Sequence, residues 1–273
     1  MPESPEVQAL VDQLAERFTG RVLHEVDVLE FRVIKTRATP PSALVGATMT
    51  GASRHGKHVD LAFGDGRLIV SLGRHGWARI MESGAEPPAD APPALASLAF
   101  DDATVELTDA GGWVSLGLYV VSSASEVPAI AKLGPDPLDP AFRRADFDRA
   151  FGGRRKQVKA ILQEQESIAG IGNAYSDEIL HAAKVSPVAH AAALSPEQLD
   201  RVFAATIAVM RDAAAARAGV PADRLKQAKV DAMQVHGRAG EACPVCGGEV
   251  REFAFGGTTA EYCPTCQTEG VLL

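Results

Sequence analysis

The chain has 273 residues, of which 46% are hydrophobic and 23% are charged, a globular composition long enough for two modest domains. Its start, MPESPEVQAL, lacks the basic region and apolar run of a secretory signal, and no apolar stretch approaches the roughly 20 residues that span a bilayer. We therefore expect a cytoplasmic protein without membrane contacts, whose formal net charge of −8 does not by itself favour a nucleic-acid partner.

The acidic charge is unevenly distributed along the chain. Seven acids and no Lys or Arg lie between Glu82 and Asp109, which accounts for −7 of the net −8. Basic residues gather instead at residues 154–159 and 217–229. Because local potential matters more than net charge, this distribution permits a DNA partner without indicating one.

The first predicted element is a helix over residues 5–18. Ser4 is a good N-cap, Pro5 suits the first helical position, and Gly20 can end the helix. Apolar residues follow at helical spacing and would form its buried face: Val7, Leu10, Val11 and Leu14.

Residues 22–121 change to short β-rich runs separated by Gly and Asp, which predicts an antiparallel β-domain. The clearest runs are HVDLAF (58–63), RLIVSL (67–72), ATVEL (103–107) and LGLYVV (116–121). The Pro/Ala-rich residues 84–97 predict an exposed loop between strands.

A segment with three prolines, GPDPLDP at 134–140, predicts a linker, and helix formers dominate from there to about residue 218. The predicted organisation is a β-domain at 1–133, a linker at 134–146, a helical domain at 147–234 and a cysteine-containing finger at 235–273.

The four cysteines form two CxxC pairs that are separated by 16 residues, a spacing typical of a four-thiolate zinc site. The β-rich stretch at 250–262 would form a hairpin between the pairs. We expect one structural Zn²⁺ held by Cys243, Cys246, Cys263 and Cys266.

A Gly-rich turn lies between two helical segments in the second half of the chain. Gly170 and Gly172 allow close backbone approach, and Asn173 could cap the following helix. The amides at that helix start suit a phosphate, with Lys159 as the countercharge. Taken alone, these residues favour a simple helical hairpin.

The wider sequence, however, resembles the formamidopyrimidine-DNA glycosylase/endonuclease VIII family. The matching motifs are PESPEV at 2–7, RHGK at 54–57, GPDPL at 134–138, the Gly-rich turn, and VHGR at 235–238 leading into the cysteine pairs. The resemblance implies an α+β fold: an N-terminal antiparallel β-sandwich with a leading helix, then a helical domain with a helix–two-turns–helix motif and a zinc-bound β-hairpin.

The resemblance implies a base-excision DNA glycosylase and abasic-site lyase. Removal of Met1 would expose the secondary amine of Pro2, which would capture C1′ of the damaged nucleotide as a Schiff base and promote β,δ-elimination. Glu3 would protonate the sugar ring oxygen, with Glu6 as a supporting carboxylate. Lys57 would contact the DNA backbone beside the lesion.

The resemblance also implies contacts with damaged double-stranded DNA by a monomeric protein. Lys159, Gly172 and Asn173 would grip phosphates, and the zinc hairpin would add a further contact. Thr258 stands where the family usually carries an Arg on that hairpin.

The loops that fill the vacated base stack also depart from the pattern of the 8-oxoguanine enzymes. Arg74 lies where those enzymes place a Met, and Trp113 lies in a loop where they place Arg and Phe. Trp113 would either wedge into the duplex or pack inside the protein, and Arg74 would either pair with the orphaned base or serve the structure. Because of these departures, the sequence does not predict which damaged base is the substrate. They also motivate an alternative, a non-catalytic or lyase-only binder of damaged DNA. A further alternative is a zinc protein that serves protein–protein contacts, with vestigial DNA motifs.

Overall fold

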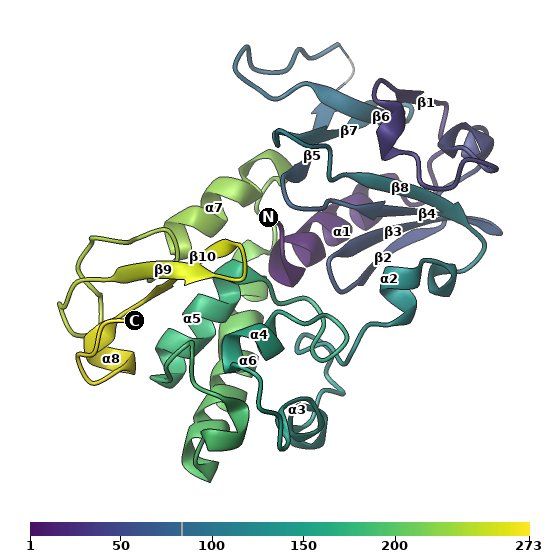
Figure 1. Cartoon of the computed structure of the whole chain (residues 1–273). Helices are drawn as coiled ribbons and strands as arrows, with labels where there is room; N and C mark the ends of the chain where they lie inside the picture. Colours follow the sequence, from purple (N-terminus) through teal and green to yellow (C-terminus); the bar gives the residue numbers. More distant parts are fainter. Residues whose placement is uncertain (83) are drawn as a thin grey trace. The chain divides into compact units, whose positions relative to one another are not determined.

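The computed structural model describes residues 1–82 and 84–273, which form two compact units. The first unit comprises Met1–Lys132 together with Arg217–Lys226, and the second comprises Leu133–Ala216 and Gln227–Leu273 (Figure 1). Residues 217–226 are predicted from the sequence to belong to the helical domain at 147–234. In the structure these residues return to the first unit, where the 3-10 helix Ala222–Arg224 lies against β5.

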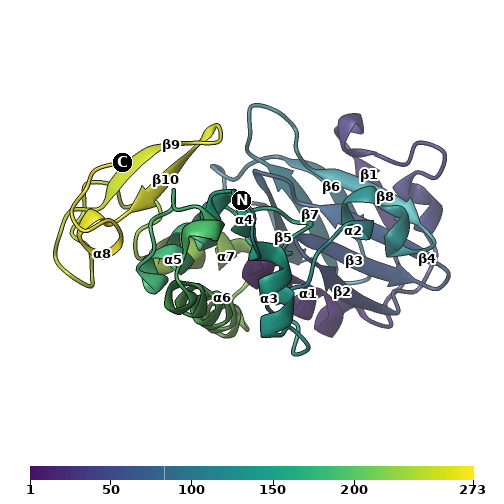
Figure 2. The same cartoon turned by 60° about the horizontal axis from the view of Figure 1, so that its bottom comes forward.

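The first unit is a β-sandwich of two four-stranded antiparallel sheets, as predicted (Figure 2). One sheet has the order β1-β6-β7-β5 and the other the order β2-β3-β4-β8. The strands are β1 (Glu25–Val28), β2 (Gly51–His55), β3 (His58–Phe63), β4 (Gly66–Ser71), β5 (Gly76–Glu82), β6 (Ala94–Ala99), β7 (Ala103–Asp109) and β8 (Gly117–Val121).

Side chains of both sheets meet in one apolar core. In the β3–β4 pair Leu61 lies opposite Leu68, and in the β5–β7 pair Ile80 lies opposite Val105. Leu61, Leu68 and Val105 are at most 2% exposed, because alternate residues of each strand face the core. The four strand-like runs of the sequence correspond to β3, β4, β7 and β8, with Leu72 and Leu116 just outside their strands.

The Pro/Ala-rich stretch at 84–97 is only partly the loop that the sequence predicted. Its last residues enter β6, which pairs with β1 and β7. Ala96 and Leu98 are both 0% exposed and alternate with more exposed neighbours, so a period-two pattern lies within the proline-rich composition.

Helix α1 (Ser4–Phe18) packs against β2 and buries the predicted apolar face (Figure 2). The predicted cap was wrong by one residue: Glu3, with an extended backbone, is the N-cap, and Ser4 and Pro5 are the first helical residues. The Ser4 hydroxyl instead donates to the carbonyl of Gly56 at 3.0 Å. Gly20, at φ +87°, lies just beyond the end of the helix. A short helix α2 (Pro128–Ala131) and 3-10 turns at Phe31–Val33, Pro41–Leu44 and Ala124–Glu126 complete this unit.

The second unit is helical and carries the zinc hairpin. Its elements are α3 (Arg144–Phe151), α4 (Val158–Leu162), α5 (Asn173–Ala183), a 3-10 turn (Ala191–Ala193), α6 (Pro196–Arg217), α7 (Leu225–Ala232), β9 (Arg251–Phe255), β10 (Thr258–Tyr262) and α8 (Pro264–Gln267), with α6 and α7 crossing the unit boundary. A core that includes Phe147, Phe151, Ile161 and Ile179 fills the helical part.

The turn between α4 and α5 gives the helix–two-turns–helix arrangement that was predicted. Gly170 takes φ +89°, a backbone conformation that favours glycine. Gly172, not Asn173, is the N-cap of α5, and Asn173 is the first helical residue. β9 and β10 form the predicted antiparallel hairpin, coloured yellow in Figure 1. Of the residues described, no helix has the length and apolarity needed to cross a membrane.

Candidate active site and DNA-binding elements

The start of α1 gathers the residues predicted to do chemistry. Pro2 is buried, Glu3 and Glu6 are each 1% exposed, and Met1 is exposed. A carboxylate oxygen of Glu6, Oε2, accepts the backbone N–H of Glu3 at 3.0 Å. Glu6 therefore anchors the peptide bond that joins Pro2 to Glu3, so the N-terminal residues are held by the helix that follows them.

The turn that carries Lys57 is fastened to the same helix start. Arg54 Nη1 donates to the Ser4 hydroxyl and to the Gly56 carbonyl, both at 2.8 Å, and its Nε donates to Gln8 at 2.9 Å. The structure thus brings the half-buried Lys57 and the N-terminal residues into one neighbourhood. The motif at 54–57 contributes its Arg as a brace and its Lys as a candidate DNA contact.

Two exposed loops of the first unit carry the predicted stack-filling residues. Asp109 accepts hydrogen bonds from the backbone of Gly111, Ser115 and Leu116 and from the Ser115 hydroxyl. That hydroxyl in turn accepts the backbone N–H of Arg74 at 2.9 Å, which joins the two loops. Burial raises the pKa of Asp109, but the four hydrogen bonds that it accepts outweigh burial, so its pKa lies below the usual range.

The same arrangement decides between two interpretations of Trp113. Its side chain is 85% exposed, so it has no packing role in the core. Arg74 is exposed as well. Although the two residues are far apart in the sequence, Asp109 and Ser115 present their loops together at the surface.

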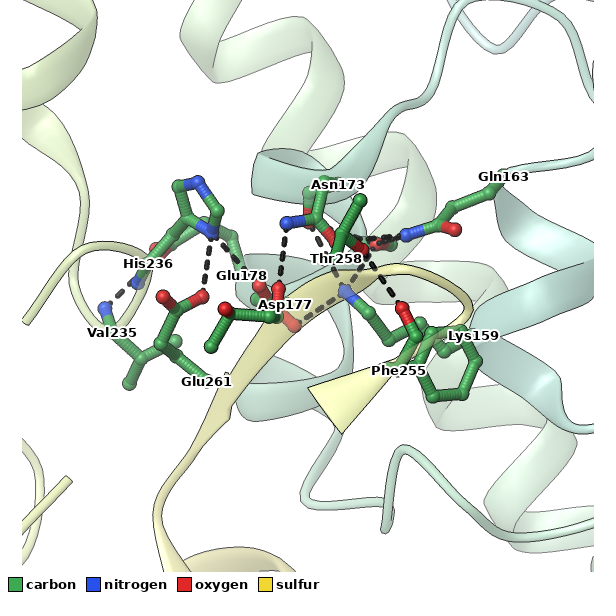
Figure 3. Close-up of polar contacts among 12 residues, drawn as sticks. Lys159, Gln163, Asn173, Asp177, Glu178, Val235, His236, Phe255, Thr258 and Glu261 are labelled. Carbon is green, nitrogen blue, oxygen red and sulfur yellow. Dashed lines mark hydrogen bonds and ion pairs between the residues drawn. The ribbon is translucent and has the colours of Figure 1, made fainter. Parts of the chain in front are cut away.

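In the second unit, Lys159 lies in a buried network of charges (Figure 3). Its ammonium is fully buried and donates to Asp177 Oδ1 at 2.5 Å, to the Ser176 hydroxyl at 2.9 Å and to the Asn173 carbonyl at 3.2 Å. The predicted direct contact of Lys159 with a phosphate does not fit this position, because no solvent-facing surface of the side chain remains.

The network continues from α5 into the finger. His236 Nδ1 lies 2.8 Å from Asp177 Oδ2 and 2.9 Å from Glu261 Oε2. Burial lowers the pKa of His236, but hydrogen bonds and charges from Asp177 and Glu261 outweigh it and raise the pKa to about 9. Burial raises the pKa of Asp177 to about 6, against the lowering effects of His236 and Lys159. Two cations and two carboxylates therefore face one another within hydrogen-bond distance.

Neighbouring contacts fix the hairpin to the start of α5. Asn173 Nδ2 donates to the Thr259 carbonyl at 2.8 Å, and Gln163 donates to Asn173 Oδ1 at 3.0 Å (Figure 3). The hydroxyl of the exposed Thr258 donates a hydrogen bond to the Phe255 carbonyl at 2.9 Å, which closes the hairpin turn. Asn173 and Gly172 lie where the helix start was predicted, and Thr258 places no charge on the hairpin tip.

The acidic and histidine members of this network were not predicted from the sequence. Glu178 accepts the backbone N–H groups of Gln234, Val235 and His236 at 2.9–3.0 Å, so it anchors the motif at 235–238. The adjacent acids Asp177 and Glu178 inside a helical segment were a usable signal, because a buried carboxylate needs partners. Their partners in the finger, Val235 and His236 among them, lie more than 50 residues away and cannot be identified from a single sequence.

The four cysteines fit a tetrahedral zinc ion. Cys243 Sγ lies 4.0 Å from Cys266 Sγ, and Cys246 Sγ lies 3.4 Å from Cys263 Sγ. Tetrahedral Zn–S bonds of ~2.3 Å require S···S separations of roughly 3.8 Å. His181 Nε2 lies 3.2 Å from Cys243 Sγ, and because burial lowers its pKa, it is suited to donate a neutral N–H to a thiolate ligand. This cluster holds one structural Zn²⁺.

The fold combines three parts: a β-sandwich with a leading helix, a helix–two-turns–helix unit and a four-cysteine hairpin. This combination defines a class of zinc-finger proteins. Family models match all three parts: the formamidopyrimidine-DNA glycosylase N-terminal domain at residues 1–111, the formamidopyrimidine-DNA glycosylase H2TH domain at 133–223, and the zinc finger found in FPG and IleRS at 240–268. The chain belongs to the formamidopyrimidine-DNA glycosylase family.

Curated relatives support this assignment over the full length. The formamidopyrimidine-DNA glycosylase of Mycolicibacterium vanbaalenii is 33% identical over 98% of both chains, and that of Listeria innocua is 31% identical over 98% of this chain and 100% of its own. An uncharacterized formamidopyrimidine-DNA glycosylase-like protein of Mycobacterium tuberculosis is 45% identical, over 54% of this chain and 91% of its own.

Solved structures of this family also resemble the fold over nearly the whole chain. The Lactococcus lactis Fpg in complex with abasic-site DNA gives a TM-score of 0.84 at 25% identity, covering 97% of this chain and 99% of that one. MutM in complex with DNA that contains carbocyclic 8-oxo-G gives 0.85 at 26% identity, covering 98% and 100%.

Proposed function

We propose that this protein is a base-excision DNA glycosylase that also cleaves the resulting abasic site, with the amine of Pro2 as its nucleophile. Membership in a family of DNA glycosylases supports the excision activity. The observation that carries the nucleophile is the N-terminus itself: a secondary amine becomes available at a buried helix start as soon as Met1 is removed.

The proposed chemistry proceeds through a covalent intermediate. The Pro2 nitrogen attacks C1′, the bond from C1′ to the damaged base breaks, and the base leaves with a proton. The sugar ring then opens: the C1′–O4′ bond breaks, O4′ takes up a proton, and the nitrogen lone pair forms the C1′=N bond of an iminium. The resulting iminium acidifies the C2′ proton, whose loss expels the 3′-phosphate. Glu3, next to the amine and 1% exposed, is placed to move protons to and from the sugar.

The positive end of α1 supports the reactivity of this amine. An α-amino group with a pKa of roughly 7.7–8.0 is mostly protonated at neutral pH. The partial positive charge at a helix start disfavours a further positive charge there, so it promotes the neutral form that attacks carbon. Glu6 holds the adjoining peptide bond, which orients the amine.

We propose that damaged double-stranded DNA is the partner; two solved structures that this chain resembles are complexes with abasic-site DNA and with DNA that contains carbocyclic 8-oxo-G. The start of α5 offers backbone amides to a phosphate, with Gly172 as a cap that admits close approach. Lys57 supplies a charged contact near the N-terminus. The exposed Trp113 and Arg74 are placed to enter the duplex where the damaged nucleotide leaves the stack.

Strand cleavage of a duplex with a single abasic site tests this function. Purified protein shown by mass to lack Met1 should nick the abasic strand, and a Pro2→Gly variant with the same processing should lose most of that activity. Full cleavage by Pro2→Gly would overturn the role of Pro2.

A second function, binding of damaged DNA without chemistry, is favoured by the neutral Thr258 at the hairpin tip. Salt-sensitive binding of the duplex together with no cleavage of any lesion or abasic site would select that function.

A further inference from the structure

Two loops cross from one sheet of the β-sandwich to the other at the same end of the first unit. The loop at 72–75 leads from β4 to β5, and the loop at 110–116 leads from β7 to β8. The last residue of β4 pairs with the first residue of β8, and the first residue of β5 pairs with the last residue of β7. Because the strands on both sides are paired, the two loops run side by side. The shorter loop carries Arg74 and the longer one carries Trp113.

The hydroxyl of Ser115 joins the two loops. It donates to Asp109 Oδ2 at 2.8 Å, and it accepts the backbone N–H groups of Arg74 at 2.9 Å and of His75 at 3.3 Å. A serine hydroxyl has one proton and two acceptor lone pairs, so all of its hydrogen-bonding capacity is used here. The buried carboxylate of Asp109 also accepts three backbone N–H groups of the longer loop, so it fixes both that loop and the hydroxyl that links it to the shorter one.

Close packing of the two backbones reinforces this junction. Gly73 takes φ +59°, and a Cβ atom on it would lie 2.6 Å from the Cβ of Ser115. A Cβ atom on Gly111 would lie 2.5 Å from the ring of His75, and the N–H of Ala110 donates to the His75 carbonyl at 3.4 Å. The loops are therefore packed too closely for a side chain to fit between them, and a displacement of one loop moves the other.

This junction affects the two exposed side chains that the loops carry. Trp113 is 85% exposed and Arg74 is exposed, so packing in the core orders neither of them. A side chain on an independent loop pays the cost of ordering its loop when it enters a duplex. Two side chains on loops that are fixed to each other pay that cost once, and most of it is paid when the protein folds.

We propose that Arg74 and Trp113 enter the duplex together, as the two prongs of one rigid element, and that Ser115 is the positioning residue that couples them. This inference rests on the function proposed above, because it concerns the step in which the damaged nucleotide leaves the stack. It makes the opening of the stack a single joint event, and it assigns a role in that event to a side chain that does not itself enter the DNA.

The test uses a duplex in which a tetrahydrofuran analogue of an abasic site faces 2-aminopurine. The analogue has no leaving group or hydroxyl at C1′, so it forms no Schiff base, and the fluorescence of 2-aminopurine rises when its stacking is disturbed. Stopped-flow fluorescence at saturating protein measures the rate of insertion. Fluorescence anisotropy of the same duplex measures binding, and thermal melting verifies that each variant is folded.

Arg74→Ala and Trp113→Ala should each slow insertion by about 10- to 100-fold, the range expected when a stacking side chain is lost. The rate loss of the double variant should be about 10-fold smaller than the product of the two single losses, because the shared ordering cost is paid only once. In the Ser115→Ala background the losses should multiply, since each loop then moves independently.

Ser115→Ala alone should slow insertion by about 3- to 10-fold, while duplex affinity changes less than about threefold. Ser122→Ala is the matched control, because the Ser122 hydroxyl also donates to a carboxylate, that of Glu126 at 2.6 Å, in the turn after β8. It should keep the wild-type rate.

Single losses that multiply in the wild-type background would overturn the inference, and this part of the test needs only variants of exposed side chains, so it decides even if Ser115→Ala does not fold. A double-variant loss that stays smaller than the product in folded Ser115→Ala overturns it as well, and so does a wild-type protein that saturates the duplex without a change in fluorescence. Wild-type protein that inserts here but never cleaves a natural abasic site overturns the proposed function and supports this inference.

Discussion

Both units of this protein bury charges beside the start of a helix, but they balance those charges in different ways. At the start of α1, one carboxylate oxygen of Glu6 accepts the backbone N–H of Glu3 at 3.0 Å, and the other lies 3.7 Å from the guanidinium of Arg217. At the start of α5, Lys159, His236, Asp177 and Glu261 lie 2.5–2.9 Å from their partners. The first arrangement places a long ion pair beside the N-terminal residues, whereas in the second the charges lie at hydrogen-bond distance and join α5 to the finger.

The comparison separates two kinds of motif residue. Lys159 and Asn173 resemble family residues that grip phosphates, yet both are committed to contacts inside the second unit. Arg74 and Trp113 depart from the family pattern, yet both are exposed on braced loops of the first unit. Resemblance therefore identifies positions, and burial decides what a side chain at each position can contact.

The largest expected effect comes from removing the zinc ion of the second unit. Binding of a structural Zn²⁺ contributes about 10–16 kcal/mol in isolated finger peptides, so chelation should unfold residues 235–273. Hydrogen exchange should show loss of protection in β9 and β10 with β3, β4 and β7 unchanged, and metal analysis should find one zinc per chain. Protection that survives complete zinc removal would show that the charge network alone holds the finger.

The buried ion pair should be sensitive to loss of one partner. Lys159→Met leaves Asp177 buried without its closest cation and should lower the free energy of unfolding by about 3–5 kcal/mol. Lys156→Met, in a residue whose side chain is 40% exposed, should cost at most about 1 kcal/mol. Urea denaturation measures both. Unchanged stability with weakened DNA binding in Lys159→Met would show that Lys159 leaves its pocket to contact DNA.

The histidine of the network predicts a pH dependence. Because the pKa of His236 is raised to about 9, its contribution to stability is fully present below the unfolded-state pKa of ~6.5 and is lost as pH rises through about 9. His236→Asn should therefore be less stable than the wild type by about 1–3 kcal/mol at pH 6.5, and the difference should shrink toward pH 9.5. Equal differences at both pH values would mean that His236 is neutral in the folded protein.

The smallest effect on stability is expected at the exposed loop. Trp113→Ala should change the free energy of unfolding by less than about 0.5 kcal/mol, because the side chain is 85% exposed. It should nevertheless slow excision of a paired damaged base more than cleavage of a preformed abasic site, since only the former requires extrusion from an intact pair. Equal rates on both substrates would remove Trp113 from the extrusion step.

Much of the fold was predictable because it depends on local signals. The run at 58–63 is β3, the spacing of Val7, Leu10, Val11 and Leu14 is the buried face of α1, and the cysteine spacing gave the finger. β6 was missed where its alternation lay within a proline-rich stretch, and both helix caps were displaced by one residue.

Site residues were predictable only where they lie in motifs that resemble those of the glycosylase family. Pro2, Glu3 and Lys57 could be named, but the burial of Lys159 could not, because it depends on Asp177 at close range and Glu261 far along the chain. Arg217 gave no sequence signal beyond its place in a basic segment. Its burial near Glu6 depends on the return of residues 217–226 to the first unit, which is a property of the tertiary fold.

The most direct test of the central claim is to locate the covalent bond to DNA. The wild-type protein would be incubated with an abasic duplex, reduced with borohydride and digested with trypsin, and the cross-linked peptide identified by mass spectrometry. We predict a reduced sugar on the amine of the peptide from Pro2 to Arg17. A cross-link on Lys57 or another lysine, or no cross-link from protein that lacks Met1 and binds the duplex, would contradict the account.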